Sequence, residues 1–309
     1  MFALFLGAGF SKWAGDLPLG SQLFDFAVEP FGVREQRRLQ RLVQHKHDWD
    51  AANPAGLAEQ FIASVLYGEN ERSKEDVLWY IVRRLSEAFI WEEWHAGRER
   101  RHVLMIDENR KWGRPGVRAA ADFIIQCGMQ LSGIVTLNYD LLVEYALGSK
   151  RFNYGVPAEV LQGRGPYPVS QWRNPVRLTG RLPLAKLHGS ISWDMACKYT
   201  DGRRGLSGKA LIVAPTPNKK PPEELEDQWG FSRSILKRVR RLLVFGFAFN
   251  DYDEAVLMHL REAGRHIQEI GIVDVVSRVS AAMRLWPKAE ILMFPPPPEG
   301  LAAIKSWMS

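Results

Sequence analysis

Residues 2–11, FALFLGAGFS, consist of an apolar run followed directly by a glycine turn, and this combination indicates the fold class. The run Phe2–Leu6 is typical of a strand that is buried on both faces of a sheet. In the turn Gly7–Ser11, glycines let the backbone come close to a pyrophosphate, which free N–H groups can bind. The turn lacks the third glycine of the usual dinucleotide fingerprint, so on its own it fits a plain tight turn equally well.

Short apolar segments of the same kind return in the second half of the chain, separated by helical patterns or loops. They are Gly133–Leu137, Leu184–Leu187, Ala210–Ala214, Leu242–Phe245, Gly271–Val276 and Glu290–Phe294. The clearest helical pattern is Asp253–His266. Strands that alternate with helices predict an α/β fold with a mostly parallel sheet and helices on both faces.

Residues 21–129 read almost entirely as helix, because apolar side chains recur at helical spacing. We therefore expect one doubly wound domain, residues 1–24 plus 130–309, with a helical insertion over residues 25–129 after the first strand. The insertion is expected to cover a ligand crevice or to form an oligomer contact. The segment Gln162–Thr179 is rich in Gly, Pro and Arg and is predicted to be a long loop.

The composition indicates a globular protein without a membrane span. The 309 residues are 46% hydrophobic and 25% charged. No apolar run approaches the ~20 residues of a membrane span, and Met1–Leu6 lacks the features of a signal peptide. Cys127 and Cys197 stand far apart and form neither a disulfide framework nor a paired-thiol zinc motif. These features favour a cytoplasmic protein that needs no metal.

The positive charge is unevenly distributed. The formal net charge is +6, yet residues 150–241 alone hold 18 Lys or Arg against 7 Asp or Glu. An anionic ligand or partner can use such a surplus, and a solvated basic face explains it equally well. Direct binding of nucleic acid therefore stays open.

Polar residues follow two of the predicted strands. Asn138 and Asp140 stand in the motif TLNYD (136–140), and His188 stands in KLHGS (186–190). Ligands bind outside the carboxyl ends of parallel strands, where an imidazole can exchange a proton near neutral pH. Alternatively, Asn138 or Asp140 caps the helix Leu141–Leu147, and His188 is a structural residue.

A second glycine turn, GFAFND (246–251), follows the segment Leu242–Phe245. Gly246 would allow a nucleotide to approach the backbone closely. Asp274 lies in the segment Gly271–Val276, near its end. It is either a ligand for ribose hydroxyls or a sheet-end residue that faces water.

The motifs GAGFS, TLNYD, HGS and GFAFND, in this order and each after a predicted strand, resemble the sirtuin-like family, specifically its bacterial branch of NAD-consuming domains. The resemblance covers residues 1–24 and 130–295 and implies a Rossmann-like domain. It does not inform the insertion.

The resemblance implies a role for each motif. Residues implied to hold the NAD pyrophosphate are Gly7, Ala8, Gly9 and Ser11. Residues implied to lie near the adenosine half are Gly246, Phe247 and the turn that they begin. Asn138 would contact the nicotinamide ribose and help to place the attacking oxygen, and Asp140 would face the nicotinamide pocket. His188 would contact the ribose hydroxyls and act as general base.

The chain departs from protein-deacylating sirtuins in two ways. It lacks their four-cysteine zinc module, and it carries Gly15-Asp16-Leu17-Pro18-Leu19-Gly20 where they carry a GIPDFR loop. Since the zinc module forms one wall of the acyl-lysine groove, the resemblance favours an NAD glycohydrolase, with NAD as substrate and water as nucleophile. An NAD-dependent protein deacylase or ADP-ribosyltransferase, a non-catalytic NAD- or ADP-ribose-binding module and a basic nucleic-acid-bound scaffold are the alternatives.

Domains that resemble this one commonly serve prokaryotic antiphage defence by depleting NAD when they are triggered. The resemblance therefore implies a homo-oligomer in the cytoplasm. It also implies a partner protein that acts as sensor or activator, such as an ATPase or a nucleic-acid-binding protein.

Overall fold

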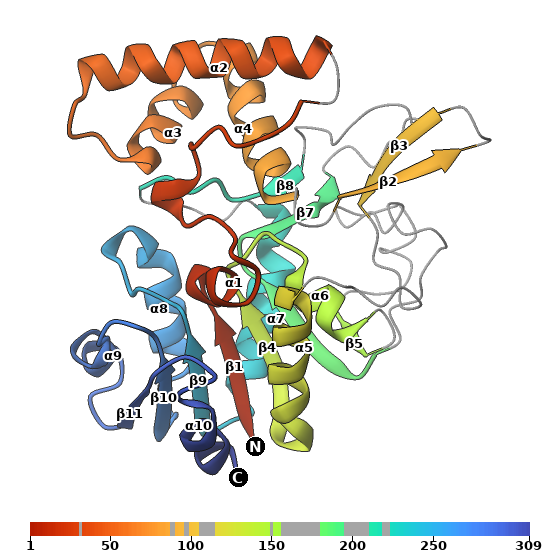
Figure 1. Cartoon of the computed structure of the whole chain (residues 1–309). Coiled ribbons are helices and arrows are strands. Elements are labelled where there is room, and N and C mark those ends of the chain that lie inside the picture. Colours follow the sequence, from red (N-terminus) through yellow and green to blue (C-terminus); the bar gives the residue numbers. More distant parts are fainter. Residues whose placement is uncertain are drawn as a thin grey trace.

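A parallel sheet forms the centre of the protein (Figure 1). The computed structural model describes residues 1–30, 33–86, 90–95, 99–104, 115–148, 151–155, 180–194, 210–217 and 223–309. The expected loop Gln162–Thr179 lies outside these residues, as does Cys197. The strands of the sheet are β1 (Phe2–Leu6), β4 (Leu131–Thr136), β5 (Phe152–Asn153), β6 (Leu182–Lys186), β9 (Arg241–Phe245), β10 (Glu269–Val273) and β11 (Glu290–Phe294).

The order of the strands creates a switch point beside β1. The order is β11-β10-β9-β1-β4-β6-β5, and every pairing is parallel. From β1 the chain moves outward through β4 to β6, crosses back, and moves outward again from β9 to β11. This is the order of a dinucleotide-binding Rossmann fold with β5 added at one edge, and ligands of such folds bind where the order reverses.

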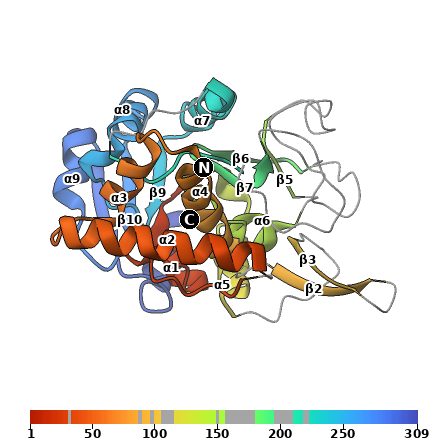
Figure 2. The ribbon, with the colours of Figure 1, turned by 90° about the horizontal axis from the view of Figure 1, so that it is seen from above.

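Alternate residues of β1 contribute to two cores. Phe2, Leu4 and Leu6 belong to one hydrophobic cluster, Ala3 and Phe5 belong to the other, and all are fully buried. The first face is covered by α1 (Ala8–Gly15), α5 (Pro115–Gln126), α6 (Leu142–Leu147) and α10 (Leu301–Met308). The second is covered by α7 (Glu226–Leu236), α8 (Glu254–Ala263) and α9 (Val279–Leu285). Figure 2 shows helices on both sides of the sheet, so the predicted α/β fold is confirmed.

Helices inserted after the first strand lie above the carboxyl ends of the strands in Figure 1. They are α2 (Val33–Ala52), α3 (Ala58–Leu66) and α4 (Glu71–Ser86). Tyr80 of α4 stacks on Phe24 with ring centroids 5.2 Å apart and donates a hydrogen bond to Leu23 O. These contacts fix the segment that leaves α1. Since α5 packs against α1 and α6, it belongs to the helical layer on the sheet, and the division at residues 25–129 stays a prediction.

The prediction of helix across nearly all of residues 21–129 is wrong for a β-hairpin. Strands β2 (Ile90–His95) and β3 (Glu99–Leu104) pair in antiparallel register. The register sets Glu93 opposite Arg101 and runs from Ile90, opposite Leu104, to His95, opposite Glu99. The sequences of the two strands, IWEEWH and ERRHVL, do not alternate apolar and polar residues, so the periodicity that predicts a strand is missing.

The segment Ala210–Ala214 is also not part of the parallel sheet. Its residues form β8 (Ala210–Ile212), which pairs in antiparallel fashion with β7 (Gly189–Asp194) in a separate two-stranded sheet. The chain turns at Gly189, whose φ of +78° favours glycine. An apolar run of this length predicts a strand but does not predict its partner.

His259 joins α7 to α8 on the second face of the sheet. Its ring is buried, its Nε2 lies 3.0 Å from Ser232 Oγ, and Trp229 meets the ring edge-on at 5.0 Å. Burial, aided by the charge of Arg233, lowers the pKa of His259 from 6.5 to about 4. Between these two values the unfolded chain binds a proton at this position that the folded chain does not.

We expect the free energy of unfolding to fall as the pH drops from about 6.5 to about 4, because protonation of His259 then favours the unfolded chain. The loss attributable to this residue is about 3 kcal/mol, at roughly 1.4 kcal/mol per unit of pKa difference. Urea unfolding across this pH range measures it. The variant His259→Gln should lose this part of the pH dependence, whereas His266→Gln, at an exposed histidine, should retain it. Identical pH dependence in all three proteins would contradict the assignment.

Candidate functional site

Two glycine turns meet backbone to backbone at the switch point. Gly9 N donates to Gly246 O at 2.9 Å. A Cβ on Gly7 would lie 2.5 Å from Gly246 O, and a Cβ on Gly9 would lie 2.6 Å from Gly246 Cα. Gly246 has a φ of +66°, in the left-handed region that favours glycine. Glycine is therefore required for the two turns to pack together, which places the start of α1 beside the end of β9.

Ser11 of α1 joins the first glycine turn to the polar motif after β4. Ser11 Oγ donates to Asp140 Oδ2 at 2.7 Å and accepts a hydrogen bond from Asn138 Nδ2 at 2.8 Å. Asn138 Nδ2 also donates to Gly7 O at 2.9 Å. The three side chains are buried. The fold thus assembles one network from residues that are 127 to 131 positions apart in the sequence.

The side-chain amide of Asn138 has a defined orientation. Gly7 O can only accept a hydrogen bond, so the amide atom that faces it is Nδ2. Thr136 Oγ1 accepts from Asn138 N at 3.1 Å and donates to Leu6 O at 3.3 Å, which fixes the backbone. Among the described residues no hydrogen bond involves Asn138 Oδ1. This oxygen is available to accept a hydrogen bond from a water or a ligand hydroxyl.

The carboxylate of Asp140 is held by one hydrogen bond at each of its oxygens, and its contact with a ligand stays a prediction. Its Oδ1 accepts a hydrogen bond at 2.9 Å from N of Leu142, the first residue of α6, whereas the N-cap position of this helix is Leu141. Its Oδ2 accepts from Ser11, which in turn contacts Asn138. Because both carboxylate oxygens are occupied, Asp140 acts in this structure as a positioning residue for Ser11.

His188 reaches the same edge of the sheet from the neighbouring strand. The register pairs Thr136 of β4 with Lys186 of β6, so Asn138 and His188 each stand two residues beyond a paired position. Neighbouring strands lie about 4.8 Å apart. The rings of Tyr139 and His188 stack with centroids 6.1 Å apart and planes 26° apart. The two polar motifs therefore lie side by side, next to the glycine turns.

A comparison with protein families matches a part of the chain that contains several of these residues. Residues 132–270 match the SIR2-like domain. The matched region contains Asn138, Asp140, His188 and Gly246, whereas β1 and the turn Gly7–Ser11 precede it. A comparison with curated proteins found no match.

Several solved structures are similar to nearly the whole chain at low sequence identity. A structure from work on the mechanism and regulation of Sir2 enzymes covers 99% of this chain and 89% of that chain, with 13% identity and a TM-score of 0.42. A Sir2 homologue in complex with NAD covers 99% and 87%, with 13% identity and a TM-score of 0.39. Sir2Tm bound to a propionylated peptide covers 100% and 92%, with 12% identity and a TM-score of 0.39. The ligands named are those of these proteins.

Sequence analysis did not predict a buried ionic network within the region that matches the SIR2-like domain. Lys186 Nζ donates to Glu144 Oε1 at 2.8 Å and to Asp140 O, and the side chains of Lys186 and Glu144 are at most 1% exposed. Tyr154 OH donates to Glu144 Oε1 at 2.9 Å. Burial, together with the carboxylate of Glu144, raises the pKa of Tyr154, so the phenol keeps its proton. The available signal was a charged residue in each of two apolar segments, LPLAK and LVEYAL.

Two residues predicted to bind NAD take no part in the hydrogen bonds of the Ser11–Asn138–Asp140 network. Phe247 is buried in the core, with its ring 5.2 Å from that of Phe5. Asp274 comes directly after β10, where its Oδ1 accepts from Val276 N at 3.1 Å and its Oδ2 lies 3.7 Å from Arg278 Nε. Asp274 therefore shapes the turn that leaves β10. Contact of either residue with NAD stays a prediction, as it does for Ala8 at the start of α1.

Two features are absent from the part of the chain that the structure describes. No group of three or more His, Cys, Asp or Glu side chains there could hold a metal ion. No described helix combines the length and the apolar character needed to cross a membrane. Cys127 is buried, and burial raises its pKa to about 12. Its thiol is therefore protonated at neutral pH and is a poor metal ligand.

Proposed function

We propose that the protein is an NAD glycohydrolase that breaks the bond between nicotinamide and ribose. The observation that carries the proposal is the hydrogen-bonded set Ser11, Asn138 and Asp140 beside the glycine turns, with His188 at the end of the neighbouring strand. The match of residues 132–270 to the SIR2-like domain supports NAD as the ligand.

The glycine turns suit the pyrophosphate of NAD. The turn from Gly7 leads into the N-terminus of α1, where the helix dipole attracts an anion, while Gly9 N and Phe10 N already donate to Gly246 O and Gly7 O. Gly246 keeps the facing turn free of side-chain bulk. With the pyrophosphate held at the switch point, the nicotinamide ribose would extend toward the ends of β4 and β6.

The chemistry requires few protein groups. Nicotinamide leaves as a neutral molecule and takes the electrons of the C1′–N bond, so its departure needs no proton donor. The oxygen of a water molecule then bonds to C1′ of the ribose, and His188 accepts a proton from that water. Asn138 Oδ1 would accept a hydrogen bond from the water and hold it in place. The products are nicotinamide, ADP-ribose and one proton.

The purified protein, tested alone, at high concentration and with candidate partner proteins, should convert NAD into equal amounts of nicotinamide and ADP-ribose. Chromatography of the products measures the conversion. Adding an acetylated peptide separates the alternatives, because a deacylase would form acetylated ADP-ribose, which mass spectrometry detects. If NAD bound but no nicotinamide appeared under any of these conditions, a non-catalytic NAD-binding module would be the better description.

We also propose that the activity is restrained and serves prokaryotic antiphage defence, in a cytoplasmic homo-oligomer with an activating partner. NAD is shared by the whole cell, so an unrestrained hydrolase would harm its host. The placement of α2 to α4 above the carboxyl ends of the strands supports a covering role for the insertion (Figure 1). The insertion also contacts the neighbourhood of the candidate site, because α4 packs against β7 and β7 begins directly after His188.

A further inference from the structure

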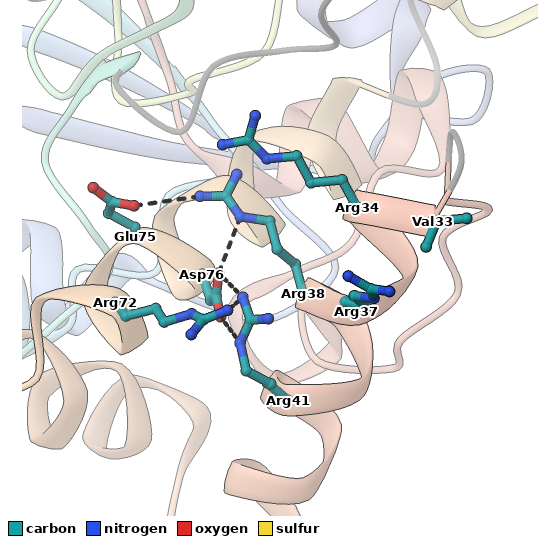
Figure 3. A pocket seen from close by; sticks show the side chains of 8 residues that line it. All are labelled: Val33, Arg34, Arg37, Arg38, Arg41, Arg72, Glu75 and Asp76. Atoms are coloured by element: carbon teal, nitrogen blue, oxygen red, sulfur yellow. Dashed lines mark hydrogen bonds and ion pairs between the residues drawn. The ribbon is translucent and has the colours of Figure 1, made fainter.

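Helices α2 and α4 form a pocket whose lining is mainly arginine (Figure 3). The arginines are Arg34, Arg37, Arg38 and Arg41 of α2 and Arg72 of α4. Their spacing along α2 keeps them on one side of the helix. The carboxylates in the lining are Glu75 and Asp76, so the pocket carries a surplus of positive charge.

Asp76 fixes the positions of two of the arginines, Arg38 and Arg41. It is 3% exposed, and its Oδ1 lies 3.0 Å from Arg38 Nε. Arg41 donates to both carboxylate oxygens, from Nε at 2.8 Å and from Nη2 at 2.9 Å. The guanidinium of Arg38 also lies 5.6 Å from the centre of the Trp79 ring. Figure 3 shows both side chains converging on Asp76, so the base of the pocket is ordered before any ligand arrives.

The other arginines of the pocket are not neutralised in the same way. Within the described residues, Arg34, Arg37 and Arg72 form no ion pair. Glu35, the acidic residue in the first turn of α2, interacts instead with Trp79 Nε1 at 3.4 Å and with Arg83 Nε at 3.7 Å. Like charges three or four residues apart on a helix repel each other. An anion in the pocket would remove this repulsion.

We propose that this pocket binds the phosphate groups of a compact polyanion, a nucleotide or an inorganic polyphosphate. Guanidinium groups pair with phosphate through two parallel hydrogen bonds, and here they come from two helices around a concave site. A single-stranded nucleic acid would be expected to use aromatic platforms for its bases. Of the lining residues that the structure describes, none is aromatic. The proposal does not depend on the cleavage of NAD.

Calorimetric titration of the full chain with inorganic tripolyphosphate tests the site. The triple variant Arg34→Gln/Arg37→Gln/Arg72→Gln leaves the partners of Asp76 intact and should weaken binding by at least about tenfold. The matched control Lys237→Gln/Arg238→Gln/Arg240→Gln removes the same charge from exposed positions elsewhere and should bind as the parent does. The single variant Arg72→Gln, with circular dichroism of each protein, gives a second reading in case the triple variant folds poorly. Tighter binding of ATP than of tripolyphosphate would identify a nucleotide, and equal binding an inorganic polyphosphate.

Three results would overturn the proposal. The first is the absence of binding heat with the parent protein for both tripolyphosphate and ATP. The second is an equal loss of binding in the control variant, which would show an effect of net charge alone. The third is tighter binding of an oligothymidylate or of polyglutamate than of tripolyphosphate through the same arginines. That result would assign the pocket to a macromolecular partner.

Discussion

Replacing His188 by alanine is expected to lower the rate of nicotinamide release by roughly 10²–10⁴-fold, because the variant loses the positioned base of the proposed reaction. Asn138→Ala should cost a comparable factor through lost positioning of the water, since it also removes the hydrogen bonds to Gly7 O and Ser11 Oγ. NAD should still bind to both variants, because the glycine turns are unchanged. Calorimetry with NAD and chromatography of nicotinamide measure the two properties separately.

The exposed His266 provides a matched control, and His266→Ala should retain the parent rate. If His188→Ala and Asn138→Ala bound NAD and cleaved it at the parent rate under activating conditions, the assignment of these residues would be wrong. Loss of NAD binding in both variants, with folding intact, would instead make them binding residues.

Replacing Lys186 by methionine is expected to lower the free energy of unfolding by about 3–5 kcal/mol. The change leaves the Glu144 carboxylate buried without its cation, with Tyr154 OH as its remaining hydrogen-bond donor among the contacts described above. Lys186→Met/Glu144→Leu removes both charges and should recover part of the loss, at least about 1 kcal/mol. Urea unfolding of the single and double variants measures the effect.

An exposed ion pair supplies the comparison for Lys186. Lys74 pairs with Glu71, whose side chain is 79% exposed, and Lys74→Met should leave the urea midpoint nearly unchanged. If Lys186→Met behaved like Lys74→Met, the pair of Lys186 with Glu144 would contribute no more than a surface pair. Because Lys186 Nζ also donates to Asp140 O, a large loss would locate part of the stability of the fold directly beneath the candidate site.

The sheet was predictable because its longer strands are apolar runs, and all of these except β11 end at a polar or glycine motif. The hydrogen bond between Ser11 and Asn138 was not predictable, because it requires β1 and β4 to be neighbours in the sheet. The apolar pattern of a single strand does not specify which strands lie beside it. The same limit explains β8. Its apolar run predicted a strand, but the turn at Gly189 gave it an antiparallel partner outside the parallel sheet.

The candidate site was predictable as a set of positions but not as a set of contacts. Ligand binding at the carboxyl edge is a property of the fold, so Asn138 and His188 could be selected from their places after strands. Which oxygen of Asp140 accepts from Leu142 N and which accepts from Ser11 depends on the three-dimensional path of the turn. The ion pair of Lys186 with Glu144 was not predicted, because a single charged residue in an apolar segment is interpreted as exposed to solvent until its partner is known.

The contact between the glycine turns also constrains how the sequence can change during evolution. A side chain on Gly7, Gly9 or Gly246 would press into the backbone of the opposite turn. The two turns lie far apart in the sequence but touch in the fold, so a larger residue in one requires the other turn to move away. A substitution at any one of the three glycines would disrupt this contact, so the residues tolerated at each position depend on the other two.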